Sequence, residues 1–413
     1  MAERTLAPGS SQARLILIGT AMLLWLGMGM RQTFGLFLAP ITHDLGVTAG
    51  EYTLALAIQN IVWGFSQALV GAAADRFGLR IIMVAGAALY AVGLGVMAAA
   101  TSASALFISG GLVGMALSCV TTSLVMTACV RAVSPARRST SIGIVSAIGC
   151  LGTLVIPLAT QSLLAREPWQ ISALFLVLLA LAMLPAAYWS GGADKLAGQG
   201  RAKAASTREV LGQAMRNRPY AVMSGAYFVC GLVTVFLTTH LPAYLHLCGQ
   251  DPMLSAEALA VIGVMSAVGA LATGWLGARY PRHILLGLLY ILRSVIFAAY
   301  FMMPPTPAST LLFAAAMGLL WWPGLAPLMT GVVTENFGTR NLATLLGVSF
   351  VVHQVGASLG TWGGGLIFDL FGSYDRAWQI GALVGFAAGV VQILAGGPSN
   401  RQDRLGVRAI ATT

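Results

Sequence analysis

Two arginines and a histidine lie within long apolar stretches of this chain. Arg31, Arg293 and His353 each stand among mostly apolar or small neighbours, whereas all 13 acidic residues lie between these stretches or near their ends. A guanidinium in apolar surroundings needs an anionic or dipolar partner, and it can bond both oxygens of a carboxylate in one plane. The pattern therefore predicts a site that attracts small organic anions and repels cations.

The apolar stretches are long enough to cross a membrane. The chain of 413 residues is 57% hydrophobic and 9% charged, whereas soluble domains are about 25% charged. A membrane-spanning helix needs about 20 apolar residues, and long runs without period-two alternation exclude a β-barrel. Twelve candidate spans follow, at residues 15–38, 51–74, 81–101, 104–130, 140–162, 169–190, 219–247, 255–278, 283–303, 308–332, 341–369 and 377–396.

The longest hydrophilic interval divides these spans six and six. It covers residues 191–218 and carries six cations separated mainly by Gly and Ala. The predicted fold is an all-α membrane protein with twelve transmembrane helices in two six-helix bundles. The predicted division is an N-terminal bundle at residues 1–190, a cytoplasmic linker at 191–218 and a C-terminal bundle at 219–413.

Lys and Arg are distributed unequally between the two sides of the membrane. If the N-terminus is inside, 19 of the 23 cations lie in inner segments, and only Arg166 and Arg376 lie in outer loops. Because cytoplasmic loops are enriched in cations, we predict a cell (inner) membrane protein with both termini cytoplasmic. This explains the net charge of +10 without nucleic acid, and it suggests contact with anionic lipids. We expect a monomer.

The five cysteines do not form a metal or disulfide pattern. Four of them lie in apolar stretches, and no two have CxxC spacing, so we expect neither a disulfide framework nor a metal site. The aqueous segments also lack a nucleotide-binding loop and a Ser-His-Asp set. We therefore predict no cofactor and no enzymatic activity.

A charged turn between the second and third spans recurs half a chain later. The first copy reads Gly71-Ala-Ala-Ala-Asp75-Arg76-Phe77-Gly78-Leu79-Arg80, and the second reads Gly274-Trp-Leu-Gly-Ala278-Arg279-Tyr280-Pro281-Arg282-His283. The second copy has an alanine where the first has its acid. Two similar six-helix halves are typical of a transporter that rocks around a central site.

The first copy of this turn resembles the hallmark loop of the major facilitator superfamily. The resemblance implies two bundles around a central cavity that opens alternately to each side. It also implies that Asp75, Arg76 and Arg80 are gating residues, with Asp75 opposite the N-terminal end of span 11 when the inner side is closed. A carboxylate there contributes about 0.3–1 kcal/mol. Alternatively, these charges only determine topology.

Within the superfamily, the chain looks most like the monocarboxylate and oxalate–formate branch. The supporting stretches are Gly29-Met-Arg31-Gln32-Thr-Phe34-Gly35 and Arg138…Gly149…Gly152…Pro157. An arginine common in span 8 of that branch is absent, since this stretch reads Val268-Gly-Ala-Leu-Ala-Thr-Gly274. The Gly-Pro-x-x-Gly-Gly pattern of drug–proton antiporters is absent from span 5.

Candidate substrate-binding residues of the first half lie on spans 1 and 2. Arg31 shares a helical face with two glycines and is the candidate for carboxylate binding; the alternative is that it snorkels outward or bonds neighbouring helices. Gln59 and Asn60 belong to a polar stripe on span 2 that cannot face lipid.

The second half contributes three further candidates. Tyr227 is a hydrogen-bond donor toward the cavity. His353 carries a proton or bonds the substrate, or else forms only an interhelical hydrogen bond. Arg293 is a candidate substrate ligand. The alternative is a structural role supported by Tyr290, because span 9 is usually peripheral in the major facilitator fold that the chain resembles.

These observations predict a secondary active transporter for a small organic anion, with a monocarboxylate as the expected substrate. It would work by alternating access, as a proton symporter or an anion exchanger. The alternatives are an efflux antiporter for amphipathic drugs or metabolites, a transporter-like receptor and a membrane enzyme.

Overall fold

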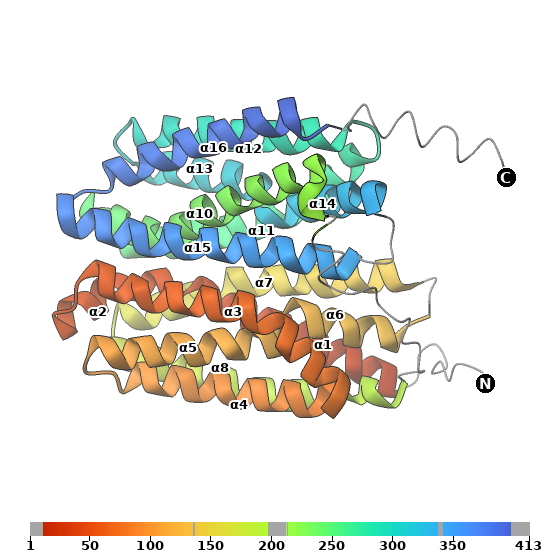
Figure 1. The fold of residues 1–413 in the computed structure, drawn as a ribbon. Helices are drawn as coiled ribbons and strands as arrows, with labels where there is room; N and C mark the ends of the chain where they lie inside the picture. Colours follow the sequence, from red (N-terminus) through yellow and green to blue (C-terminus); the bar gives the residue numbers. More distant parts are fainter. Residues whose placement is uncertain (1–10, 135–136, 197–211, 213, 338–341, 398–413) are drawn as a thin grey trace.

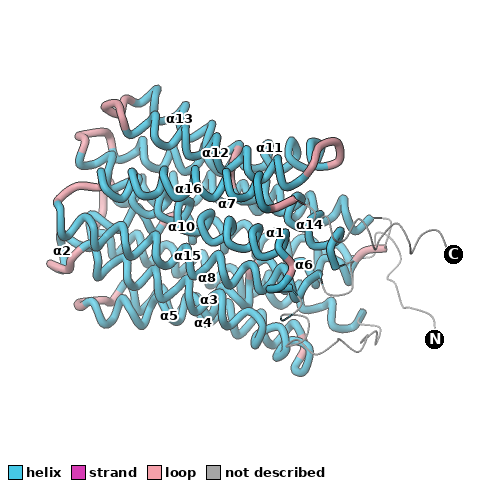
Figure 2. The backbone as a smooth tube through the Cα atoms, turned by 45° about the horizontal axis from the view of Figure 1, so that its top comes forward, coloured by secondary structure: helices cyan, strands magenta, loops and turns pink. Residues whose placement is uncertain are grey.

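The computed structural model describes residues 11–134, 137–196, 212, 214–337 and 342–397, and these residues form helices joined by short loops without any strand (Figure 2). Twelve helical segments of this described part are long and apolar enough to span a membrane. The helices are α1 (Ser11–Gln32), η1 (Phe34–Phe37), α2 (Leu38–Leu45), α3 (Ala49–Phe77), α4 (Leu79–Ala98), α5 (Ala103–Val120), α6 (Thr122–Ala132), α7 (Arg138–Leu164), α8 (Trp169–Ser190), η3 (Gly191–Leu196), α10 (Arg218–Leu247), α11 (Pro252–Gly277), α12 (Arg282–Phe301), α13 (Pro307–Leu319), α14 (Trp322–Phe337), α15 (Leu342–Phe371) and α16 (Asp375–Ala395).

The helices form two bundles that follow the two halves of the chain. In Figure 1, α1 to α8 (red to yellow) lie below α10 to α16 (green to blue). One large cluster of buried apolar side chains belongs to the first half and two belong to the second half. A small fourth cluster, Leu36 with Ala256 and Leu259, joins the two halves. The predicted fold class, twelve transmembrane helices in two six-helix bundles, is confirmed.

The chain segment after α8 begins as part of the first bundle. Asp194 in η3 accepts hydrogen bonds from the backbone N–H groups of Leu79 and Arg80, at 2.8 and 3.0 Å, and thereby caps the N-terminus of α4. Residues 197–211 and 213 lie outside the described residues. The predicted limits of the linker, 191–218, therefore stay a prediction.

Three of the expected continuous spans are interrupted. The first breaks between α1 and η1 at Thr33, the fourth between α5 and α6 at Thr121, and the tenth between α13 and α14. The hydroxyls of Thr33 and Thr121 donate to the backbone carbonyls of Met30 and Leu117, and such back-bonding bends helices. Hydropathy alone could not show these breaks, because the broken segments remain apolar throughout.

The two bundles meet mainly along two helix pairs, α3 with α15 and α7 with α11, and η1 and α2 also contact α10. We call the end of the molecule where α1 begins and α16 ends the basic face, because Arg76, Arg80, Arg131 and Arg282 lie there, and we call the opposite end the far face.

Both pairs are in contact at mid-height and at the far face, but they separate toward the basic face. Gly64 of α3 leaves room for Gln354 of α15, since an added Cβ would lie 2.8 Å from the Gln354 Cβ. Gly71 and Gly347 lie seven residues from Gly64 and Gln354 toward the basic face, on the same sides of α3 and α15. A Cβ added at either glycine would meet no atom of the described residues within 4 Å. The same holds for Gly143 of α7 and Gly274 of α11. Among the described residues, the two helix pairs therefore touch toward the far face and part toward the basic face.

Candidate substrate site between the two bundles

Arg31 lies in the last turn of α1 and reaches across to α3. Its Nη2 donates to Asn60 Oδ1 at 3.1 Å, and its guanidinium lies 5.0 Å from the Trp63 ring centroid. Asn60 Nδ2 donates to the carbonyl of Leu56 at 3.0 Å, which directs the amide oxygen toward Arg31. The arginine therefore faces the neighbouring helices, and Asn60 holds one edge of the guanidinium in place.

Gln59, the other predicted residue of α3, is buried beside this arginine. With Arg31, Asn60, Thr238 and Thr239 it lines a cavity of about 20 Å³ between the first bundle and α10. That volume suits about one water molecule. Gln59 is thus placed at the far-face end of the region around Arg31.

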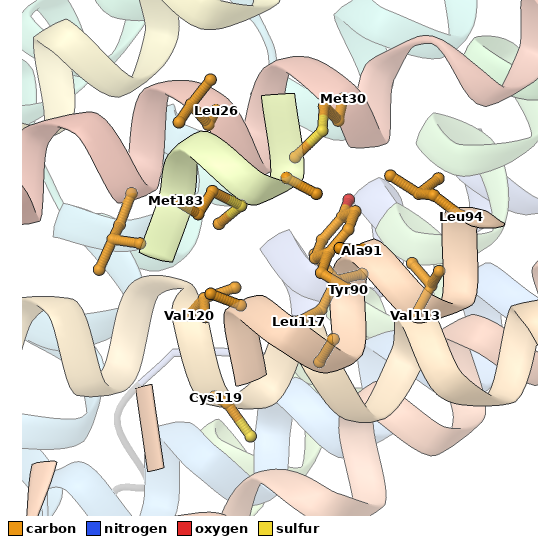
Figure 3. Close-up of a cluster of buried hydrophobic side chains, with 14 of the residues drawn as sticks. Leu26, Met30, Tyr90, Ala91, Leu94, Val113, Leu117, Cys119, Val120 and Met183 are labelled. Atoms are coloured by element: carbon orange, nitrogen blue, oxygen red, sulfur yellow. The ribbon is translucent and has the colours of Figure 1, made fainter. Parts of the chain in front are cut away.

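Tyr90 of α4 also belongs to this region, although the sequence did not single it out. It is fully buried among apolar side chains, and its hydroxyl points toward α1 beside Met30 (Figure 3). The charge of Arg31 acts on this hydroxyl. A tyrosine in an apolar span usually belongs to the hydrophobic core. Tyr90 is assigned to the site only because the packing of α4 against α1 directs its hydroxyl toward the region of Arg31.

His353 of α15 faces α10 and the other bundle. Its Nδ1 lies 3.1 Å from Gln354 Oε1, and its ring centroid lies 4.4 Å from that of Tyr227. Phe350 stacks in parallel with His353 at 6.0 Å and contacts Trp63 edge-on at 5.2 Å, across the bundle interface. The predicted residues Tyr227 and His353 are therefore brought together, on the side of the interface opposite Arg31.

Arg293 of α12 is buried inside the second bundle, with 2% of its surface exposed. Its Nη1 donates to Cys230 Sγ on α10 at 3.3 Å, and its guanidinium lies 5.0 Å from the Tyr290 ring centroid. The charges of Arg293 and Arg31 both act on the imidazole of His353. Although α12 is an outer helix, this side chain points to the interior.

Five buried polar atoms of this region have no hydrogen-bond partner among the described residues. They are Arg31 Nε, Trp63 Nε1, Tyr90 Oη, Arg293 Nη2 and His353 Nε2. A buried unpaired polar group costs about 1–3 kcal/mol, so such groups require an explanation. No acidic side chain is among the buried residues of the described part. The arrangement offers donors and positive charge, and it can bind an anion rich in acceptor oxygens.

The predicted gating residues lie at the basic face. Asp75 lies 3.9 Å from Arg131 of α6, and Arg131 lies 3.9 Å from Asp194. Arg76 lies over the ring of Phe77 at 5.2 Å. The partner of Asp75 among the described residues, Arg131, thus belongs to the same bundle as Asp75.

Arg80, the third predicted gating residue, lies in the first turn of α4 and contacts α8. It lies 4.3 Å from the Tyr188 ring centroid. Gly78 has φ of 93°, a conformation that L side chains rarely adopt, so the glycine permits the tight turn from α3 to α4. The predicted approach of Asp75 to the start of span 11 involves residues 338–341, which lie outside the described residues, and it stays a prediction.

Two six-helix bundles that touch at one face and part at the other have the architecture of a membrane transporter. The sequence profile described as Major Facilitator Superfamily matches residues 19–361. The chain belongs to the major facilitator superfamily, as the motif at Gly71–Arg80 predicted.

Named relatives agree with the predicted branch. The chain is 28% identical over 404 residues to monocarboxylate transporter 13 of Bos taurus, covering 95% of this chain and 91% of that protein. It is 23% identical over 359 residues to the uncharacterized MFS-type transporter YcxA of Bacillus subtilis (strain 168), covering 83% and 85%. The prediction of a superfamily member most like the monocarboxylate transporters is confirmed.

Solved structures support the fold. A bacterial homolog of the human lysosomal transporter Spinster, in an inward-facing and unoccupied conformation, superposes with a TM-score of 0.74 at 15% identity, covering 94% of this chain and 96% of that chain. The nucleoside transporter NupG superposes with a TM-score of 0.69 at 17% identity, covering 93% and 98%.

Proposed function

We propose that this protein is a secondary active transporter for a small organic anion, with a monocarboxylate as the best candidate. The observation that carries the proposal is the set of unpaired buried donors around Arg31 and His353, with no buried acid in the described part of the chain. A carboxylate supplies the acceptors that these groups lack, and Arg31 can bond both of its oxygens. The similarity to monocarboxylate transporter 13 of Bos taurus supports the same substrate class.

The same charge pattern argues against the alternative of drug efflux. Amphipathic drugs that are cations would meet Arg31 and Arg293 without an opposing buried carboxylate among the described residues. Like charges at such a site cost binding energy. An anionic substrate has no such penalty.

We further propose that the basic face is cytoplasmic and that the protein works as a monomer in the cell (inner) membrane. The excess of Lys and Arg on the side of the termini supports this orientation. In that orientation the two helix pairs part on the cytoplasmic side, which is the arrangement of an inward-facing state.

The hydrogen bonds of Gln354 favour proton symport. Gln354 Nε2 donates to the backbone carbonyl of Asn60 at 3.4 Å, so its Oε1 is the atom that faces His353 Nδ1. An amide oxygen only accepts, so Nδ1 carries the hydrogen. In a neutral imidazole, Nε2 is then the basic nitrogen, and it is also the unpaired one.

A proton on His353 Nε2 and a bound anion would stabilise each other. The cations of the region around His353 are Arg31 on α1 and Arg293 on α12, while α10 presents the phenol of Tyr227 to the imidazole. Both arginines oppose a further positive charge in the empty site. A bound carboxylate offsets that repulsion, so anion and proton should bind together.

Substrate counterflow tests the proposed function directly. In proteoliposomes loaded with unlabelled lactate, pyruvate, formate or oxalate, we expect labelled lactate or pyruvate to accumulate transiently. In vesicles loaded with unlabelled choline, we expect no accumulation of labelled choline, because the charges of Arg31 and Arg293 would disfavour a cation. Lack of counterflow for every anion would refute the proposal.

Substitution of His353 separates symport from exchange. We expect His353→Gln to retain anion counterflow but to lower pH-gradient-driven uptake at least about tenfold, because no titratable group replaces the imidazole. Uptake is measured after imposing an inside-alkaline gradient. His43→Gln, at an exposed histidine, should match the unmodified protein. Undiminished pH-driven uptake in His353→Gln would refute the role of His353.

A further inference from the structure

We infer that Asp369 is a gating residue that holds the far face closed by capping the N-terminus of a helix in the other bundle. Asp369 lies in the last turn of α15, and the helix that it contacts is α3. Its Oδ1 accepts the backbone N–H of Ala49 at 3.1 Å, and its Oδ2 accepts that of Gly50 at 2.7 Å. The carboxylate therefore bridges the two bundles at the far face.

The backbone N–H groups of Ala49 and Gly50 are free to bind Asp369 because the other N–H groups at the start of α3 have partners close to them in the sequence. Thr48 and Glu51 form a capping box, in which Thr48 Oγ1 accepts from Glu51 N at 3.1 Å and Glu51 Oε2 accepts from Thr48 N at 2.8 Å. The N–H of Tyr52 bonds the carbonyl of Thr48. Only the N–H groups of Ala49 and Gly50 remain, and helix N-termini favour a negative charge.

Small residues on both helices allow this approach. A Cβ on Gly50 would lie 2.6 Å from Asp369 Oδ2, and a Cβ on Gly365 would lie 2.7 Å from the carbonyl oxygen of Ala49. Glycine at both positions therefore permits the first turn of α3 to lie directly against α15. The contact between α3 and α15 therefore depends on these two glycines as well as on the carboxylate of Asp369.

The end of α15 is braced within its own bundle. Tyr374 stacks on Phe368 at 4.8 Å, and its Oη lies 3.2 Å from His240 Nδ1. His240 Nε2 donates to the carbonyl of Thr361 at 2.8 Å, which leaves Nδ1 to accept the phenol proton. Burial and, secondarily, the charge of Asp369 raise the pKa of Tyr374, so the phenol stays protonated. Asp369 thus projects from a rigid end of the second bundle.

Opening of the far face must break both hydrogen bonds of Asp369 and return its partners to water. The bonds therefore bias the molecule toward the conformation described here. Because α3 and α15 run antiparallel, Asp369 acts at the end of this helix pair opposite to Asp75. Loss of the carboxylate should raise the population that is open at the far face.

A buried reporter cysteine measures that population without any substrate. Thr239, which packs at the far-face interface beside Gly35 and is 4% exposed, is replaced by Cys in a Cys248→Ser background, since Cys248 is exposed. A membrane-impermeant maleimide is applied from the far side. We expect Asp369→Ala to raise the labelling rate about fivefold, as expected for loss of a charged helix cap.

Two further variants keep the inference falsifiable. Asp251→Ala removes an aspartate that caps its own helix through Met253 N, and it should leave the labelling rate unchanged. Gly50→Ala should raise the rate as Asp369→Ala does, and the two changes together should add little. Rates are normalised to protein that elutes as a single folded species. Equal rates in Asp369→Ala, Gly50→Ala and Asp251→Ala would overturn the inference, whatever the outcome of the anion transport assays.

Discussion

Arg31→Ala is expected to lower anion uptake at subsaturating substrate at least about 100-fold. Charge-assisted hydrogen bonds contribute about 1.5–3 kcal/mol each, and every 1.4 kcal/mol is about tenfold in affinity. Arg31 provides the planar pair of donors beside Trp63, with Asn60 holding the guanidinium. Initial rates of labelled lactate and pyruvate uptake in proteoliposomes measure the effect.

Two further variants separate the effect of planar hydrogen bonding by Arg31 from the effect of its positive charge. Arg31→Lys keeps the positive charge but cannot bond both carboxylate oxygens in one plane, so we expect a loss of about tenfold. Arg279→Ala removes an exposed arginine that also lies over a tryptophan, 3.8 Å from the Trp275 ring centroid, and it should transport normally. Normal uptake by Arg31→Ala would exclude Arg31 as the carboxylate ligand.

Gly356→Ala is expected to destabilise the second bundle by about 2–3 kcal/mol. A Cβ at this position of α15 would overlap the carbonyl oxygen of Phe228 and lie 2.8 Å from its carbonyl carbon on α10. Backbone atoms cannot rotate away, so the two helices must separate. Thermal unfolding of the purified protein in detergent, followed by intrinsic tryptophan fluorescence, should show a lower midpoint.

Gly363→Ala on the same helix is the matched control. A Cβ there meets no atom within 4 Å, and alanine favours a helix over glycine by about 1 kcal/mol. We expect this variant to unfold at the same temperature as the unmodified protein or slightly higher. A midpoint for Gly356→Ala as high as that of Gly363→Ala would show that α10 and α15 tolerate a wider spacing.

The separation of α10 and α15 also matters for the site. Gly231 of α10 lies against the backbone of His353, where a Cβ would lie 3.0 Å from the His353 carbonyl carbon. The same close packing sets the distance between Tyr227 and the imidazole. Glycines that look like simple packing residues in the sequence therefore position the proposed proton carrier.

The sequence by itself determined that the protein lies in a lipid bilayer, how many spans it has and to which family it belongs. It also determined that the charged side chains within the spans are cations. Each of these depends on quantities that add along the chain: hydropathy over about 20 residues, the distribution of Lys and Arg, and the motif from Gly71 to Arg80. Arg31, Arg293 and His353 were identified as candidates because a charge in an apolar span is costly wherever the fold places it.

Only the tertiary structure decided which groups face one another. Tyr90 and Trp63 join the site because α4 and α3 present them toward Arg31, and the buried position of Arg293 follows from its contact with Cys230 on α10. The hydrogen bonds that the N–H groups of Ala49 and Gly50 donate to Asp369 join residues about 320 positions apart in the sequence. Hydrogen bonds and steric contacts act over a few ångströms in space, so no local pattern of residues specifies them before the helices have packed.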